Sequence, residues 1–273
     1  MSSTSVAVIN CREAGAYRGR IGNDRLRFIA NVLRNVPQDN LIVVSMHIPL
    51  QSFDNPDGAA DTTVDRTALL RLLSHRPHSV SFSGHSHTTE HHYFGGEYSS
   101  VRDEPHHHHV LTAACGSWWS GPCDPTGVPI ADSRDGTPKG FHVLSVDGNQ
   151  YATRFVPFGL APEQDLRILI STTDANTELF VDVFDGGPLT RVTCEIAGEP
   201  ASAVALERAG VPDPYVVEVF ARYRALCKPW VAAAPSSHVW KALLPEHLES
   251  RRDALVVRVT DEYGASIVRC VTG

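Results

Sequence analysis

The most constraining feature of this chain is a short alternating segment that ends in two histidines. Val80 and Phe82 alternate with serines over residues 79–83, which is the two-residue period of a β-strand. The sequence Gly84-His85-Ser86-His87 follows directly, and we expect the glycine to let the backbone turn there without a side-chain clash. The segment therefore predicts a strand that delivers two imidazoles to its carboxyl end, where they would suit a transition metal.

A second predicted strand leads to the same edge of the sheet. Residues 40–50 form a nearly continuous apolar run that contains His47, and Pro49 ends its pairing. In open α/β sheets, ligands bind beyond the carboxyl ends of the strands. We therefore expect His47, His85 and His87 to lie at one edge as metal ligands.

These motifs resemble a known family. Met46-His47-Ile48-Pro49 and Gly84-His85-Ser86-His87 resemble the C-terminal motifs of the calcineurin-like metallophosphoesterases. Residues 115–122, which include Trp118 and Trp119, and residues 135–141 resemble the branch of that family that carries an extra C-terminal domain.

The resemblance implies metal-dependent hydrolysis of a phosphoester of unknown class. It implies a centre of two divalent ions (Mn, Fe or Zn), with His47 and His85 on one ion and His87 on the other. Such ions activate a water molecule and offset charge on the phosphoryl group.

Three motifs that the family uses for its other ligands do not occur in the 273 residues: D-x-H, G-D-x-x-D/N and G-N-H-E/D. Gly22-Asn23-Asp24 lacks the histidine of the last motif and opens a predicted helix. We therefore expect that the chain lacks the N-terminal half of the catalytic domain. By itself it would hold at most one ion, weakly, and would be inactive or nearly so.

The expected architecture is α/β over residues 1–160, a partial αββα sandwich, followed by an all-β, sandwich-like domain over residues 161–273. In the first part, amphipathic helices are expected at 24–33, with Asn23 as the cap, and at 64–73. A long Gly/Pro/Asp-rich loop at 115–139 and a hairpin over 140–155 follow. The expected strands of the second part lie at 166–170, 179–184, 192–196 and 254–259.

Composition narrows the functional classes. The 42% hydrophobic and 20% charged residues are typical of a soluble globular protein, and the net charge of −7 argues against non-specific nucleic-acid binding. No apolar run approaches the ~20 residues of a membrane span, and no secretory signal is recognisable, although relatives are often exported. Six scattered cysteines indicate buried free thiols, with a Cys115–Cys123 pair as the alternative.

Several other residues allow two interpretations. His106–His109 runs into a strand that places His107 and His109 on one face; we expect a solvated loop, with His109 as a weak metal contact or substrate-facing side chain as the alternative. Trp118 and Trp119 would either stack on a sugar or base or pack beneath their loop. Asp54, Asp57 and Asp61 would cap turns rather than bind metal.

The rival function is a non-catalytic module that recognises a glycan or a cell-envelope partner through the Trp-Trp loop and the β-sandwich. We also expect the strand at 6–9 and the His47 strand to have unpaired edges or bare faces, which would favour a homodimer.

Overall fold

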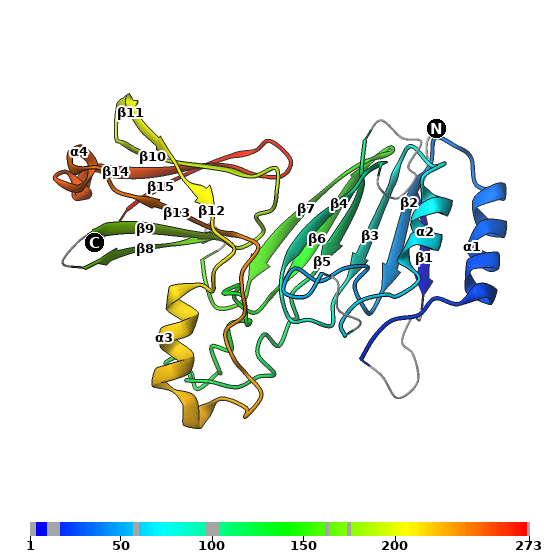
Figure 1. Cartoon of the computed structure of the whole chain (residues 1–273), viewed down its shortest axis with the longest axis horizontal. Helices are drawn as coiled ribbons and strands as arrows, with labels where there is room; N and C mark the ends of the chain where they lie inside the picture. The colour runs from blue at the N-terminus through cyan, green and yellow to red at the C-terminus, as the bar shows by residue number, and fades with distance from the viewer. Residues whose placement is uncertain are drawn as a thin grey trace. The chain divides into compact units, whose positions relative to one another are not determined.

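The computed structural model describes residues 4–9, 17–56, 60–96, 104–161, 164–173 and 176–271. The chain forms two compact units (Figure 1). The first contains residues 1–113 and 142–154, and the second contains residues 114–141 and 155–273. The long loop after the first sheet thus belongs to the C-terminal unit, which a single boundary near residue 160 does not capture.

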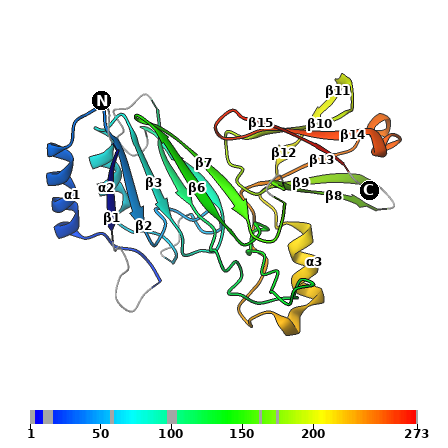
Figure 2. The ribbon, with the colours of Figure 1, turned by 180° about the vertical axis from the view of Figure 1, so that it is seen from behind.

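The first unit is built on a five-stranded sheet in the order β1-β2-β3-β5-β4. β1, β2, β3 and β5 are parallel, and β4 runs antiparallel to β5. Both helices lie on one face of this sheet (Figures 1 and 2). The elements are β1 (Thr4–Ile9), α1 (Asn23–Asn35), β2 (Leu41–Met46), α2 (Arg66–Leu73), β3 (Ser79–Ser83), β4 (Glu90–Phe94) and β5 (His106–Val110).

The helical face of the sheet is held by a hydrophobic core. Ile42, Val44 and Met46 alternate along β2 and belong to one buried cluster with Ile29 of α1 and Leu69 of α2. The expected helices are therefore confirmed, but the expected cap is wrong. Gly22 precedes α1, and no side chain caps the helix there. Instead, the Asp65 carboxylate accepts hydrogen bonds from the backbone N–H groups of Ile21 and Gly22, at 2.9 and 2.8 Å.

β5 consists of four histidines and a valine, and all five residues are buried. The expectation of a solvated loop over residues 106–109 is therefore wrong. The reason lies on β3, where serines and apolar residues alternate in register with the histidines: Ser81 lies opposite His108, and Val80 opposite His107. Long-range strand pairing supplies hydroxyl partners that the local sequence does not reveal.

The hydroxyls and imidazoles on the helical face form a continuous ladder. Leu50 N–H donates to His108 Nε2 at 3.1 Å, which makes that nitrogen an acceptor. In a neutral ring the other nitrogen then carries the proton, so His108 Nδ1–H donates to Ser81 Oγ at 2.7 Å. Ser81 O–H in turn donates to His106 Nε2 at 2.9 Å, and His106 Nδ1–H donates to Ser79 Oγ at 2.9 Å. Leu50 N–H can only donate, so it sets the direction of these bonds, and Ser83 O–H, whose oxygen lies 3.0 Å from the same His108 nitrogen, then also donates to it.

The imidazoles of His107 and His108 are uncharged near neutral pH. Burial, followed by repulsion from neighbouring histidines, holds the pKa of His107 and of His108 well below the usual histidine value. Neutral rings can both donate and accept a hydrogen bond, as the ladder requires.

The sequence predicted the hairpin of β6 (Gly140–Asp147) and β7 (Gln150–Pro157). In the structure this hairpin packs against the opposite face of the sheet. Leu41, Val43, Val80 and Phe82 form a buried cluster there, against which Tyr151 packs. This cluster does not extend over β1, where Val6 and Val8 are 66% and 82% exposed.

The expectations for the two N-terminal strands have different outcomes. β1 is the outermost strand of the sheet order and has an exposed apolar face, so the expectation for it is confirmed. The expectation for the His47 strand is wrong, because β2 is paired with β1 on one side and β3 on the other, and most of its residues are buried.

The second unit contains two four-stranded antiparallel sheets, in the orders β11-β10-β14-β15 and β12-β13-β9-β8. Residues of both sheets, including Val181 and Val257, share one buried cluster, which confirms the predicted sandwich. The strands are β8 (Leu166–Thr172), β9 (Thr177–Val183), β10 (Arg191–Ile196), β11 (Glu199–Ala205), β12 (Glu207–Arg208), β13 (Val239–Leu243), β14 (Leu255–Thr260) and β15 (Ser266–Cys270).

The helices of this unit were not expected from the sequence. Asp213 caps α3 (Pro214–Arg222) by accepting a hydrogen bond from Tyr215 N–H, and Pro214 occupies the first turn. Val216 and Phe220, four residues apart, give α3 its buried face. The sequence Asp213-Pro214 is thus a typical start of a helix, although α3 has only nine residues. Shorter helical turns are η2 (Arg224–Leu226), α4 (Glu246–Glu249) and η3 (Arg252–Ala254).

A buried ionic cluster ties the loop of residues 114–141 to the sandwich. Arg167 forms ion pairs with Asp132, Asp182 and Asp213, and His238 lies between Asp135 and Asp182. The loop also approaches closely at Gly136, which has φ +105°, and a Cβ there would collide with the Asp182 and Asp213 side chains.

In this cluster, four aspartate side chains surround Arg167 and His238, and this excess of carboxylates favours the protonated forms of His238 and of the aspartates. Burial lowers the pKa of His238, but the carboxylates of Asp182 and Asp135 outweigh burial and raise it well above the usual value. Burial also raises the pKa of Asp182 to about 8 and that of Asp132 to about 6. The folded second unit therefore binds more protons near neutral pH than the unfolded chain does.

The described cysteines are free: Cys115, Cys123, Cys194, Cys227 and Cys270. Cys115 and Cys123 are therefore not joined, and Cys123 and Cys270 are exposed rather than buried; Cys11 lies outside the described residues. None of the helices in the described part of the chain is long and apolar enough to cross a membrane.

The ionic cluster predicts how the stability of the second unit depends on pH. Both His238 and Asp182 have raised pKa values, so their contribution to stability is present at low pH and is lost as pH rises through the folded-state values. Between pH 6 and pH 9 the wild type should therefore lose about 2 kcal/mol more unfolding free energy than Asp182→Asn/His238→Gln.

Urea unfolding followed by tryptophan fluorescence measures this quantity, because Trp118, Trp119, Trp230 and Trp240 all belong to the second unit. The exposed His247 provides the control: His247→Gln should follow the wild type at both pH values. Equal losses in the wild type and the double variant would contradict the prediction.

Candidate metal centre

His47 and His85 lie at the carboxyl edge of the first sheet, as predicted, directly beyond β2 and just beyond β3. The two connecting loops are joined by a hydrogen bond, in which Gly84 N–H donates to the His47 carbonyl oxygen at 3.0 Å. This bond fixes the relative position of the two histidine-bearing segments.

The backbone of this edge is unusual at the histidines themselves. His85 and His87 have φ values of 77° and 56°, in the left-handed region that side chains rarely adopt. Gly84 does not adopt such a conformation, and a Cβ there would make only ordinary contact, at 3.6 Å from the Leu111 carbonyl oxygen. The expectation that Gly84 provides the turn is therefore wrong, because the turn is made by the histidines.

The two imidazoles are in contact. His47 Nε2 lies 3.1 Å from His85 Nδ1, and the ring planes are nearly perpendicular. On its other side, His85 Nε2–H donates to Asp61 Oδ1 at 3.0 Å. The His85 side chain is 15% exposed and that of Asp61 is 46% exposed, so the site is open to solvent on the Asp61 side.

This geometry fits the binding of one metal ion by His47 and His85. Two nitrogens on a tetrahedral zinc-type ion lie about 3.3 Å apart, close to the spacing found here. A metal-binding histidine commonly donates its other N–H to a carboxylate, which fixes the tautomer and the ring orientation. Asp61 makes this contact with His85, so it orients a candidate ligand rather than only capping a turn.

Neither the sequence interpretation of Asp61 nor its local pattern indicated this contact. Asp61 lies in a polar loop after β2, and only the folded structure brings it to a residue 24 positions further along the chain. Of the other acidic residues considered there, Asp57 lies outside the described residues.

His87 is half-buried and lies two residues beyond His85. Within the described part of the chain, no group of three metal-ligating side chains with donor atoms within 4.8 Å of one another includes His47, His85 or His87. The structure thus brings two of the three predicted ligands together and adds Asp61. The metal assignments of all three histidines stay predictions.

One such group does occur in the first unit, on the other face of β5. It consists of His91, His107 and His109, all buried. His109, considered above for substrate contact, is fully buried within this group.

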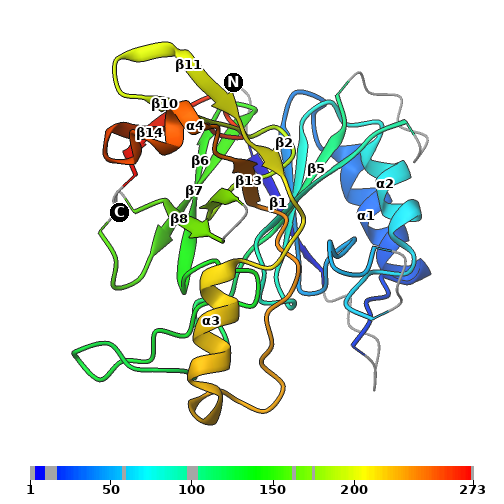
Figure 3. The same ribbon diagram turned by 60° about the vertical axis from the view of Figure 1, so that its left-hand side comes forward.

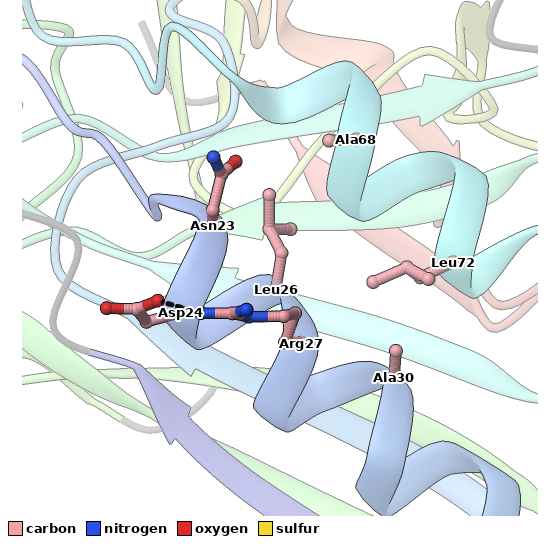
Figure 4. Close-up of a pocket in the computed structure, with 7 residues that line it drawn as sticks. All are labelled: Asn23, Asp24, Leu26, Arg27, Ala30, Ala68 and Leu72. Carbon is pink, nitrogen blue, oxygen red and sulfur yellow. Dashed lines mark hydrogen bonds and ion pairs between the residues drawn. The ribbon is translucent and has the colours of Figure 1, made fainter.

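A shallow groove between α1 and α2 does not coincide with any of these histidines (Figure 4). Its lining is mixed, with leucine and alanine side chains and the exposed Asp24–Arg27 ion pair. The groove lies on the helical side of the sheet. Asp24 is the one carboxylate among its lining residues, which include no histidine or cysteine, so the groove does not offer a group of metal ligands.

The two tryptophans of the long loop have different environments. Trp118 is partly buried and packs against Val216 and Phe220 of α3. The helix α3 lies beside the long loop (Figure 3). Trp119 is 51% exposed, and the Lys139 ammonium lies over its ring, 5.4 Å from the centroid. The packing interpretation is therefore confirmed for Trp118, whereas stacking of the exposed Trp119 on a sugar or base stays a prediction.

Comparison with known proteins gives one family. The model of the family described as "C terminal of Calcineurin-like phosphoesterase" matches residues 108–266, more than half of the chain. The match begins within β5 and extends over the second unit, so it does not include His47, His85 or His87. No curated protein matches the sequence.

Proposed function

Because the chain belongs to the family of C-terminal regions of calcineurin-like phosphoesterases, we propose that its carboxyl-edge site is an incomplete part of a centre for metal-dependent hydrolysis of a phosphoester. The observation that supports this proposal is the contact of His47 Nε2 with His85 Nδ1 at 3.1 Å, in two loops that end neighbouring strands. The family match and the geometry of the carboxyl edge are independent observations, because the match begins at residue 108 and therefore includes neither His47 nor His85.

In this proposal His47 and His85 would hold one divalent ion. A bound ion supplies Lewis-acid activation of water and charge stabilisation for the phosphoryl group. The chain's own residues position that chemistry: Asp61 fixes the His85 ring, and the Gly84–His47 backbone bond fixes the spacing of the loops.

The donor set supports only part of a two-ion centre. Two imidazoles in contact, with a carboxylate on the far side of one ring, provide no bridging carboxylate for a second ion. His87, assigned by resemblance to the second ion, belongs to no three-ligand group among the described residues. We therefore propose that these residues alone bind one ion weakly and hydrolyse phosphoesters poorly or not at all.

A zinc titration and a hydrolysis assay test this proposal together. His85→Ala should abolish edge-site binding of Zn²⁺, and Asp61→Asn should weaken it by about tenfold, since loss of an orienting partner costs 10–100-fold in affinity. The exposed His75 provides the control, and His75→Ala should leave the affinity unchanged.

With Mn²⁺ and an aryl phosphate, the wild-type chain should show no hydrolysis above that of His85→Ala. Zinc affinity that is the same in the wild type and His85→Ala would contradict the proposed site. Hydrolysis that depends on His85 would show that the site is more complete than we propose.

A second candidate function rests on the exposed aromatic surface of the second unit. Trp119 is half exposed, and the Trp230 side chain is 60% exposed and makes an edge contact with Trp118, at 6.3 Å between ring centroids. Exposed tryptophan rings can stack on sugar rings, so this surface would suit a glycan.

Retention on insoluble peptidoglycan tests this second function. Trp119→Ala should lower retention of the purified chain by about tenfold, through loss of a stacking contact of about 1.4 kcal/mol. Phe28, an exposed aromatic residue of the first unit, provides the matched control, and Phe28→Ala should be retained like the wild type. Equal retention of all three proteins would rule out the glycan proposal.

A homodimer is the remaining proposal for this chain. Val6 and Val8 leave the outermost strand of the first sheet with an exposed apolar face, and a second copy could cover it.

A further inference from the structure

We propose that His91, His107 and His109 form a second metal site, buried in the first unit, that binds a zinc-type transition ion. One donor atom from each ring lies within 4.8 Å of the others, and all three side chains are buried. The site does not depend on the proposed function, because it uses none of the carboxyl-edge residues.

Strand pairing brings the three rings together. β4 and β5 are antiparallel, with His91 directly opposite His109. His107 lies two residues from His109 and therefore projects from the same face of β5. The His109 ring lies over the His91 ring, with centroids 3.9 Å apart, and the His107 ring is nearly parallel to that of His91 (9°), with centroids 5.1 Å apart.

The rings are held from behind by the hairpin. Tyr151 OH lies 2.7 Å from His107 Nδ1, and Thr153 Oγ1 lies 3.4 Å from His109 Nδ1. Both partners come from β7, two residues apart. Hydrogen bonds to the far nitrogen are the arrangement that orients metal-binding histidines, and here they direct the Nε2 atoms to the ion.

The near nitrogens have a spacing suited to an ion. His91 Nδ1 lies 2.9 Å from His107 Nε2, a contact that a bound ion would replace. Two nitrogens on a tetrahedral zinc ion are separated by about 3.3 Å, so small ring shifts suffice for this pair.

The donor chemistry identifies the class of ion. Three imidazoles provide nitrogen ligands only, which suit Zn²⁺, Co²⁺, Ni²⁺ or Cu²⁺ rather than Mg²⁺ or Ca²⁺. Three protein ligands leave one position of a tetrahedral ion open.

The alternative is a metal-free hydrogen-bonded core. Apolar residues occupy the neighbouring positions of β3, since Val80 lies opposite His107 and Phe82 opposite His109. In this alternative, the cost of burying three polar rings is offset by hydrogen bonds alone, those of His107 with His91 and Tyr151 and that of His109 with Thr153. Metal coordination would offset it more fully and would join β4 and β5 directly.

The test uses the full chain with the substitutions His47→Ala/His85→Ala. These substitutions remove the carboxyl-edge ligands, so any ion that is retained reports on the buried site and not on the proposed function. Because the site is buried, the protein is refolded with Co²⁺ and then desalted. We expect one Co²⁺ per chain, with the strong visible absorption of tetrahedral coordination.

Two further variants in this background locate the ion. His91→Gln and His109→Gln should each lower Co²⁺ retention at least tenfold. His92 provides the matched control because it neighbours His91 on β4 but hydrogen-bonds to Glu90, and His92→Gln should retain the ion. Circular dichroism establishes that each variant is folded.

X-ray absorption spectroscopy of the Zn²⁺-loaded His47→Ala/His85→Ala protein tests the proposal even if a glutamine variant fails to fold. The spectrum should show three imidazole ligands around zinc. A folded background protein that retains no Co²⁺, retention unaffected in folded His91→Gln and His109→Gln, or fewer than three imidazoles around zinc would each overturn the proposal.

Discussion

The first unit depends on the burial of four consecutive histidines in β5. Each neutral imidazole carries one donor and one acceptor, and a buried ring that lacks partners is costly. The structure meets this constraint differently on the two faces of the strand. On the helical face, His106 and His108 form a ladder with serines of β3, and Leu50 N–H sets its direction. On the other face, His107 and His109 contact His91 and two hydroxyls of β7.

The buried strands of the first unit lead directly to the carboxyl edge that carries the candidate site. The same β3 that supplies the serines continues into the loop of His85, and β2 beside it continues into His47. The pairing of β2 with β3 and the Gly84–His47 backbone hydrogen bond therefore fix the distance between the two edge histidines. In the second unit, buried polar groups also fix the position of a loop. Arg167 and His238 form ion pairs with four aspartates and so hold the loop of residues 114–141 to the sandwich.

Local pattern was enough to predict the alternation of β3, the apolar run of β2, both helices of the first unit and the β6–β7 hairpin. It also placed His47 and His85 at one edge, because parallel strands have a common direction. Contacts between distant residues were not predictable in this way. Asp61 hydrogen-bonds to His85, and Asp65, not Asn23, accepts the backbone N–H groups at the start of α1. Serines of β3, about 25 residues away in the sequence, supply the hydrogen bonds that allow the histidines of β5 to be buried. Each of these depends on register, which a single strand's sequence does not specify.

The measurement that tests this account most directly is a long-range ¹H–¹⁵N correlation spectrum of the histidine side chains at pH 6. The ladder predicts that His106 and His108 each carry one proton, on Nδ1, and the lowered pKa of His108 predicts that it remains neutral as the pH is lowered until the protein unfolds. An imidazolium signal for either residue in the folded protein, or a proton on His108 Nε2, would contradict the direction of the ladder and with it the account of how this strand is buried.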